Sequence, residues 1–68
     1  MKLIYNLQSL VWSNIMTILM LDLESSKNVI NQVHQNIING TKPITDYSEQ
    51  IKLAYEVYLY NSDILNAS

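Results

Sequence analysis

The chain has 68 residues and a net charge of −2 at pH 7, with four lysines, no arginine, no cysteine and one histidine. Clusters of Arg and Lys make the phosphate and base contacts of nucleic-acid-binding proteins, so four scattered lysines predict no direct binding of nucleic acid. The lack of cysteine excludes disulfides and thiol catalysis, and a lone histidine, His34, excludes a histidine-rich metal site. We therefore expect no cofactor, no bound metal and no enzymatic activity.

The size of the chain limits how much apolar surface it covers by itself. We interpret residues 1–68 as a single helical domain. A domain of about 60 residues buries only about 60% of the surface that its unfolded chain exposes, and small chains often need disulfides, metals or partner subunits. Charged residues make up 15% of the sequence, against about 25% in a typical globular chain, so part of the surface is expected to face another chain.

The first third of the chain carries the strongest pattern, because no charged residue occurs from Leu3 to Leu21. At about 100° per residue, the polar residues fall in one narrow strip, which contains Asn6, Ser9, Ser13 and Thr17. The pattern predicts a helix over about 3–23 that must be covered on nearly every side. We expect this helix at the centre of a homodimer or higher oligomer, with an oligomer core of Leu7, Leu10, Val11, Ile15 and Ile18.

A membrane-inserted helix over about 3–21 is the alternative for this segment. Its length matches the ~20 residues that span a bilayer, and Lys2 before it would place the N-terminus in the cytoplasm. The amide of Asn14 lies near the middle, however, and amides in hydrocarbon are costly unless another helix pairs with them. We favour a soluble, buried helix in a cytoplasmic protein, and a cleaved export signal is the least favoured reading.

A second helix is predicted over 26–39. We place a break before it because the apolar pattern lapses between Leu23 and Val29, although one helix continuing to Asn39 is left open. One face of this helix is apolar and consists of Val29, Ile30, Val33 and Ile37. Gly40 follows at the position of a left-handed C-terminal cap, and Pro43 completes the clearest break in the sequence.

A third helix is predicted over about 45–61, with Asp46 and Glu49 as a capping-box variant at its start. It carries two apolar stripes: one contains Tyr47, Ile51, Ala54, Tyr58 and Leu65, and the other contains Leu53, Val57, Tyr60 and Ile64. A short connection makes two helices antiparallel neighbours, so we expect a hairpin of the second and third helices. One stripe then meets the other helices, and the second is available to a partner chain.

The aromatic residues are the candidates for protein interaction, because large amphipathic side chains anchor interfaces. The set is Trp12, Tyr55, Tyr58 and Tyr60, and the alternative is that they fill the core. His34 has no charged residue within a helical turn, which favours a histidine at the core boundary over a catalytic one. Glu49, Glu56 and Asp63 recur every seven residues, and Lys52 among them favours a solvated face over a row of carboxylates for a basic partner.

The function that we favour is a non-enzymatic protein-interaction module that occludes the working surface of a partner. In size and helicity the chain is similar to small helical anti-repressors and inhibitors of Firmicutes and their phages, but no motif transfers a site from them. Abundant Asn, Ile, Tyr and Lys suggest an AT-rich genome of a bacterium, phage or mobile element. The alternatives are a small membrane-associated protein and a structural subunit of a larger assembly.

Overall fold

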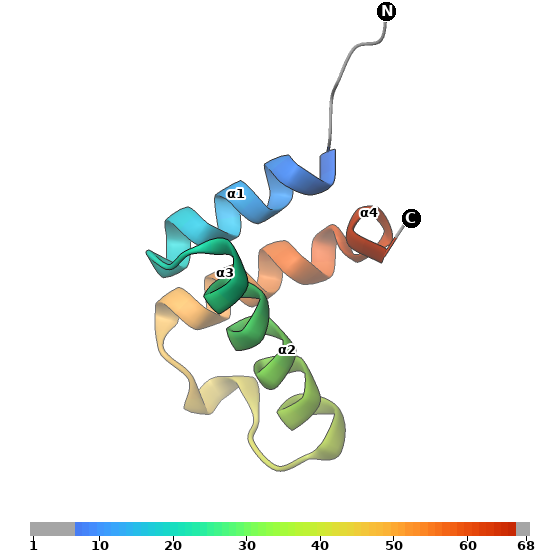
Figure 1. Ribbon diagram of the computed structural model, residues 1–68. Helices are drawn as coiled ribbons and strands as arrows, with labels where there is room; N and C mark the ends of the chain where they lie inside the picture. The colour runs from blue at the N-terminus through green and yellow to red at the C-terminus, as the bar shows by residue number, and fades with distance from the viewer. Residues whose placement is uncertain (1–6, 67–68) are drawn as a thin grey trace, which may run out of the picture.

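The computed structural model describes residues 7–66, and this part of the chain consists of helices without any strand. Its elements are α1 (Leu7–Leu19), α2 (Leu23–Asn39), the 3-10 helix η1 (Ile44–Asp46), α3 (Glu49–Tyr60) and α4 (Ser62–Asn66), as Figure 1 shows. The prediction of an all-α chain is confirmed.

The break between the first two helices lies at residues 20–22, earlier than expected. The α1 helix ends at Leu19, and the next residue, Met20, has a left-handed backbone with φ of 59°. Asp22 then caps α2, because its Oδ1 accepts a hydrogen bond of 2.7 Å from the backbone N–H of Ser25. The predicted bounds 3–23 and 26–39 are therefore wrong at this junction, and so is one helix continuing to 39. Residues 3–6 of the first prediction lie outside the described residues.

The end of α2 follows the prediction. Gly40 adopts a left-handed backbone with φ of 72°, and its N–H donates to the carbonyls of Asn36 and Ile37. A glycine has no Cβ to clash in this conformation, so it closes the helix without the steric cost that other residues meet. Pro43 follows with an extended backbone and precedes η1 as its N-cap.

The predicted third helix, about 45–61, is divided into η1 and α3, and α4 follows beyond its predicted end. Asp46 lies in η1 and does not cap α3; the cap is Ser48, whose Oγ accepts from the N–H of Ile51 at 3.4 Å. Tyr47 interrupts the helix with an extended backbone, and its hydroxyl accepts a hydrogen bond of 2.8 Å from Asn36 on α2. This contact between distant segments favours the interruption. At the other end, Asn61 separates α3 from α4.

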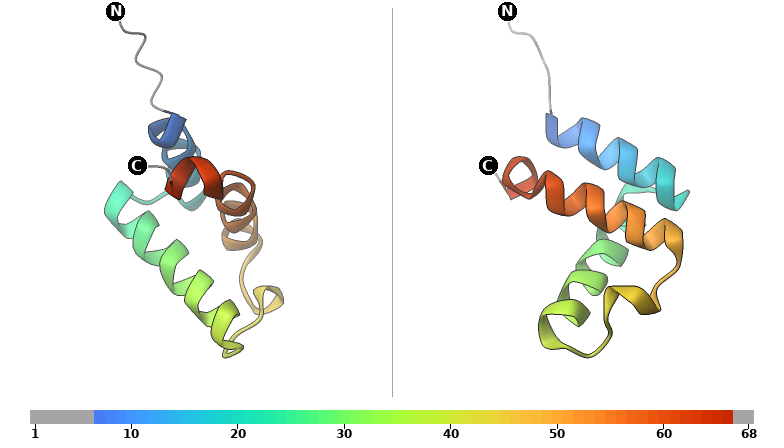
Figure 2. Two further views of the ribbon diagram at one scale, coloured as in Figure 1. Left: turned by 90° about the vertical axis from the view of Figure 1, so that its right-hand side faces the viewer. Right: turned by 180° about the vertical axis from the view of Figure 1, so that it is seen from behind.

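The α1 and α3 helices form the antiparallel pair of the fold. At one end, Gln8 Nε2 of α1 donates to the Leu65 carbonyl of α4 at 2.7 Å. At the other end, Gln50 Nε2 of α3 donates to the Ile18 carbonyl of α1 at 3.4 Å. The α2 helix runs across this pair and contacts both members, as the views of Figures 1 and 2 agree. The predicted antiparallel hairpin of the second and third helices is thus not confirmed.

The core lies where α2 crosses the pair. It contains Val11, Ile15, Ile30, Val33, Ala54, Tyr55 and Leu65. Ile15 and Ala54 are fully buried. Over residues 7–66, no helix combines the length and the apolar character that a membrane crossing requires.

Candidate functional site

Four rings from three helices form an aromatic cluster, which we define as Trp12, His34, Tyr55 and Tyr58. Tyr58 lies at its centre, with ring centroids 6.4 Å from Trp12, 5.7 Å from His34 and 6.0 Å from Tyr55. These separations fall in the range in which aromatic rings attract one another. The cluster therefore links α1, α2 and α3 by ring packing.

Tyr55 is the buried member of the aromatic cluster, with 6% of its surface exposed. Its hydroxyl lies 3.0 Å from Nδ1 of His34, which accepts this hydrogen bond in the tautomer that carries its proton on Nε2. Burial raises the pKa of Tyr55 above its ordinary value of 10.0, and Tyr58 adds to the shift. Sequence reasoning missed the partner of His34 because Tyr55 is 21 residues away.

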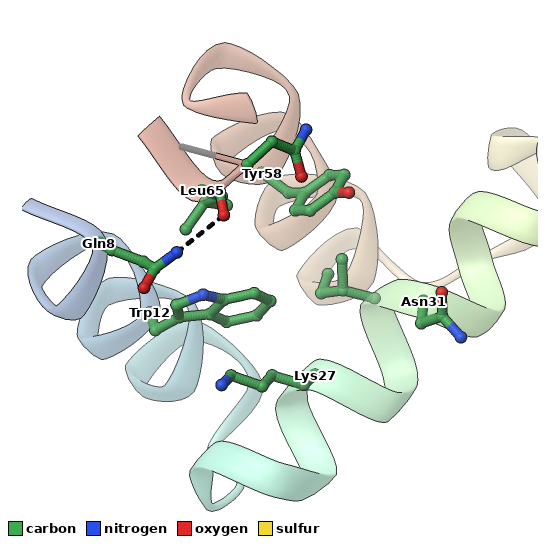
Figure 3. Close-up of a pocket in the computed structure, with 8 residues that line it drawn as sticks. Gln8, Trp12, Lys27, Asn31, Tyr58 and Leu65 are labelled. Carbon is green, nitrogen blue, oxygen red and sulfur yellow. Dashed lines mark hydrogen bonds between the residues drawn. The ribbon is translucent and has the colours of Figure 1, made fainter. Parts of the chain in front are cut away.

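A groove lies beside the exposed edge of the aromatic cluster, between α1 and α2, and we name it the Trp12 groove. It consists of two adjoining hollows that share Gln8, Trp12 and Lys27. The first has a volume of about 310 Å³ and is also lined by Asn31, Tyr58 and Leu65 (Figure 3). The second has a volume of about 460 Å³ and is also lined by Ser13, Met16 and Leu23.

Among residues 7–66, Lys27 is the only charged residue that lines either hollow. Its Nζ lies 5.6 Å from the centroid of the Trp12 ring, within the range of a cation–π interaction. Figure 3 shows its side chain extended beneath Trp12, while Gln8 reaches the Leu65 carbonyl on the other side of the ring. The groove therefore combines a positive charge, an aromatic wall and neutral amides.

A second surface lies on the side of the α1–α3 pair that faces away from α2. We define this outer face by four exposed apolar residues: Leu7, Leu10, Leu53 and Tyr60. At about 100° per residue, Leu10 is roughly 200° from Trp12, which faces the groove next to α2. Leu53 is likewise roughly 200° from Tyr55, which contacts α2 through His34. Both helices thus present apolar side chains on the same side.

The predicted oligomer core is divided by the structure. Val11 and Ile15 are buried within this chain, and Ile18 is half-buried against the same core. Leu7 and Leu10 remain about half exposed on the outer face. The first helix therefore does not depend on another chain to cover its whole circumference. Its side with Val11 and Ile15 is covered within this chain, because α2, α3 and α4 all contact α1.

The predicted interaction residues also separate into three places. Trp12 and Tyr58 line the groove, Tyr55 lies in the core behind them, and Tyr60, which is 87% exposed, lies on the outer face. Since Tyr58 and Tyr60 are two residues apart on one helix, they point to nearly opposite sides. The four aromatic residues do not form one common surface.

The charged residues of α3 and α4 lie on the solvated side of these helices. Glu49, Glu56 and Asp63 are exposed, and Lys52 Nζ lies 2.7 Å from Glu49 Oε1. Within residues 7–66, no three His, Asp or Glu side chains gather in a way that could hold a metal ion.

No family model, curated protein or solved structure matches this chain.

Proposed function

We propose that this protein is a non-enzymatic interaction module that self-associates through the outer face. The observation that carries the proposal is the exposure of Leu7, Leu10, Leu53 and Tyr60 on one side of the α1–α3 pair. Exposed large apolar side chains that gather on one side of a protein mark interaction sites. A partner that covers the outer face would remove these leucine and tyrosine side chains from water.

A second copy of this chain is the partner that we propose for the outer face. In a two-fold dimer the same patch meets itself, so a neutral apolar patch is complementary to its copy without any charge pairing. None of the four residues that define the outer face is charged, and the exposed Glu49 and Glu56 lie within roughly 60° of Leu53 on α3, at the border of the face. Burial of the exposed leucines and of Tyr60 would add to a core that contains only seven buried apolar residues among those described.

Occlusion of a partner protein is the mode of action that we propose for the module, as a regulator or inhibitor. A dimer formed through the outer face leaves the Trp12 groove of each copy accessible, because Leu10 and Trp12 lie on opposite sides of α1. Each dimer would then offer two equivalent surfaces to other proteins. Two linked sites raise the apparent affinity for a partner that presents two targets.

Light scattering coupled to size exclusion tests the proposed self-association over a range of protein concentrations. We expect a dimer that dissociates on dilution, and we expect Leu53→Gln to shift the equilibrium toward the monomer. The matched control is Leu59→Gln, because Leu53 and Leu59 lie on the same helix with 50% and 48% exposure but point in different directions. A folded monomer at micromolar concentration, or equal effects of the two variants, would contradict the proposal.

A further inference from the structure

We propose that the Trp12 groove binds a short acidic segment of a partner protein, with a carboxylate at Lys27 and an apolar side chain against Trp12. This site is separate from the outer face, so it does not depend on self-association. Its occupant is inferred from three properties of the groove: its shape, its charge and the chemistry of its lining.

The shape of the groove suits an extended peptide. Its lining along α1 extends from Gln8 to Met16, and at 1.5 Å per residue this distance is roughly 12 Å. An extended chain advances about 3.3 Å per residue, so about four residues fit along it. The two hollows lie next to each other at Trp12, which provides separate places for two neighbouring side chains.

The charge of the groove selects an acidic occupant. The sequence has a net charge of −2, yet both hollows are lined by Lys27 and by no carboxylate. Glu24 lies one turn before Lys27 on α2; it lines neither of these hollows, but it lines a neighbouring one together with Lys27. Within residues 7–66, the salt bridge of the structure joins Lys52 to Glu49 and leaves Lys27 against the Trp12 ring. A carboxylate placed there gains a cation that makes no salt bridge with any described residue.

The remaining lining supplies the other contacts that a peptide needs. Trp12, Tyr58 and Leu65 offer apolar surface in the first hollow, and Met16 and Leu23 offer it in the second. Methionine adapts to irregular partners, and a Trp ring gives a large contact area with few rotatable bonds. The amide of Asn31 on α2 can donate to or accept from a peptide backbone.

Trp12 makes the test direct, because it is the only tryptophan and lies in the groove. The probe is a short capped peptide of alternating leucine and glutamate, and its counterpart carries lysine in place of glutamate. We expect a saturable change in Trp12 emission with the acidic peptide and none with the basic one. Equal responses to the two peptides, no response to either, or equally tight binding of free N-acetylglutamate would overturn the proposal.

The decisive variant is Lys27→Met, which removes the charge and keeps an unbranched apolar side chain beside Trp12. We expect roughly fivefold weaker binding of the acidic peptide, the effect of one exposed ion pair. Lys42→Met is the matched control, because Lys42 Nζ also lies over an aromatic ring, 4.4 Å from the Tyr47 centroid, outside the groove. Equal weakening in both variants would reveal a general charge effect and refute the site.

A second variant keeps the test decisive if Lys27→Met does not fold, as far-UV circular dichroism would show. Asn31→Asp adds a carboxylate to the lining at an exposed position of α2, and we expect it to weaken binding of the acidic peptide. Unchanged binding would contradict the proposal. Leu53→Gln separates the two sites: it should bind the peptide as the parent does, even where it abolishes the dimer.

Discussion

The Tyr55 hydroxyl lies 3.0 Å from Nδ1 of His34, and this contact joins α3 to α2 at the edge of the core. The same two rings lie 6.0 Å apart, and Tyr58 packs against both. The histidine therefore has a structural role: its ring holds the crossing helix α2 against the α1–α3 pair. Four predictions about the stability of this arrangement follow from particular contacts.

Tyr55→Phe removes the hydroxyl and leaves Nδ1 of His34 without its partner. We expect the free energy of unfolding to fall by about 1 kcal/mol, the usual net contribution of one intramolecular hydrogen bond. Urea denaturation followed by circular dichroism measures the change. Tyr60→Phe is the control, because Tyr60 is 87% exposed and lies on the outer face. An equal loss of unfolding free energy in Tyr60→Phe would show that the hydrogen bond to His34 is not responsible.

Ile15→Ala creates a cavity between α1 and the rest of the core, because Ile15 is fully buried. Truncation of a buried isoleucine costs about 2–5 kcal/mol, which is comparable with the whole stability of about 3–5 kcal/mol that a core of this size supplies. We expect largely unfolded protein by circular dichroism, whereas Ile15→Val should lose only about 1 kcal/mol. Ile38→Ala, at an exposed position of α2, should stay folded.

Met20→Gly is expected to stabilise the protein. Met20 has φ of 59°, a conformation that costs residues with a Cβ about 1–2 kcal/mol, and its side chain is mostly exposed, so little packing is lost. Since glycine costs about 0.5–1 kcal/mol in chain entropy, we expect a net gain of up to about 1 kcal/mol in urea denaturation. Met16→Gly, inside α1, should instead lower the free energy of unfolding by at least about 1 kcal/mol, because glycine is a poor helix former and the half-buried Met16 side chain is lost as well.

Asp22 makes the start of α2 sensitive to acid. The hydrogen bond from the Ser25 backbone N–H lowers the pKa of the Asp22 carboxyl below its ordinary value of 3.8, so the folded state binds this proton less readily than the unfolded state. The stabilisation is present above pH 3.8 and is lost as the pH falls from there through the lowered folded pKa. Asp22→Asn keeps a capping oxygen without a titrating group.

Thermal melting of the two proteins at a series of pH values checks this prediction. We expect the melting temperature of the parent to fall more than that of Asp22→Asn in the acidic range, since only the parent loses a charged cap there. Asp22→Ala removes the cap and should melt at a lower temperature already at neutral pH. Parallel melting curves for the parent and Asp22→Asn would show that the carboxylate charge has no role.

Local features of the sequence predicted much of the secondary structure. The apolar face of α2 includes Ile30 and Val33, which are buried as expected, and Gly40 caps that helix. The predicted start of α3 was wrong because both Asp46 and Ser48 are residue types that cap helices, and the local sequence does not distinguish between them. The choice of Ser48 coincides with the contact between Tyr47 and Asn36, which a pattern along one helix does not contain.

The sequence predicted some residues of the Trp12 groove but not that they lie together. Residue type selected Trp12, Tyr55, Tyr58 and Tyr60 as candidates for an interface or for the core, but it could not assign them to different places in the fold. Lys27 was not selected, because nothing in its own helix indicates that it lies against Trp12. An outward orientation can be read from a helical wheel, whereas the neighbour across a groove depends on which helices pair.

By itself, the sequence determined that the chain is helical, where α2 ends and which faces are apolar, because these properties arise from interactions within a few residues. Only the tertiary structure decided that α1 pairs with α3, that α2 crosses them and that His34 meets Tyr55. The physical reason is that amphipathic helices pair in more than one way, so contacts between residues far apart in the sequence decide: Val11 and Ile15 of α1 are buried in the shared core, and the Gln8 and Gln50 hydrogen bonds hold the two ends of the α1–α3 pair.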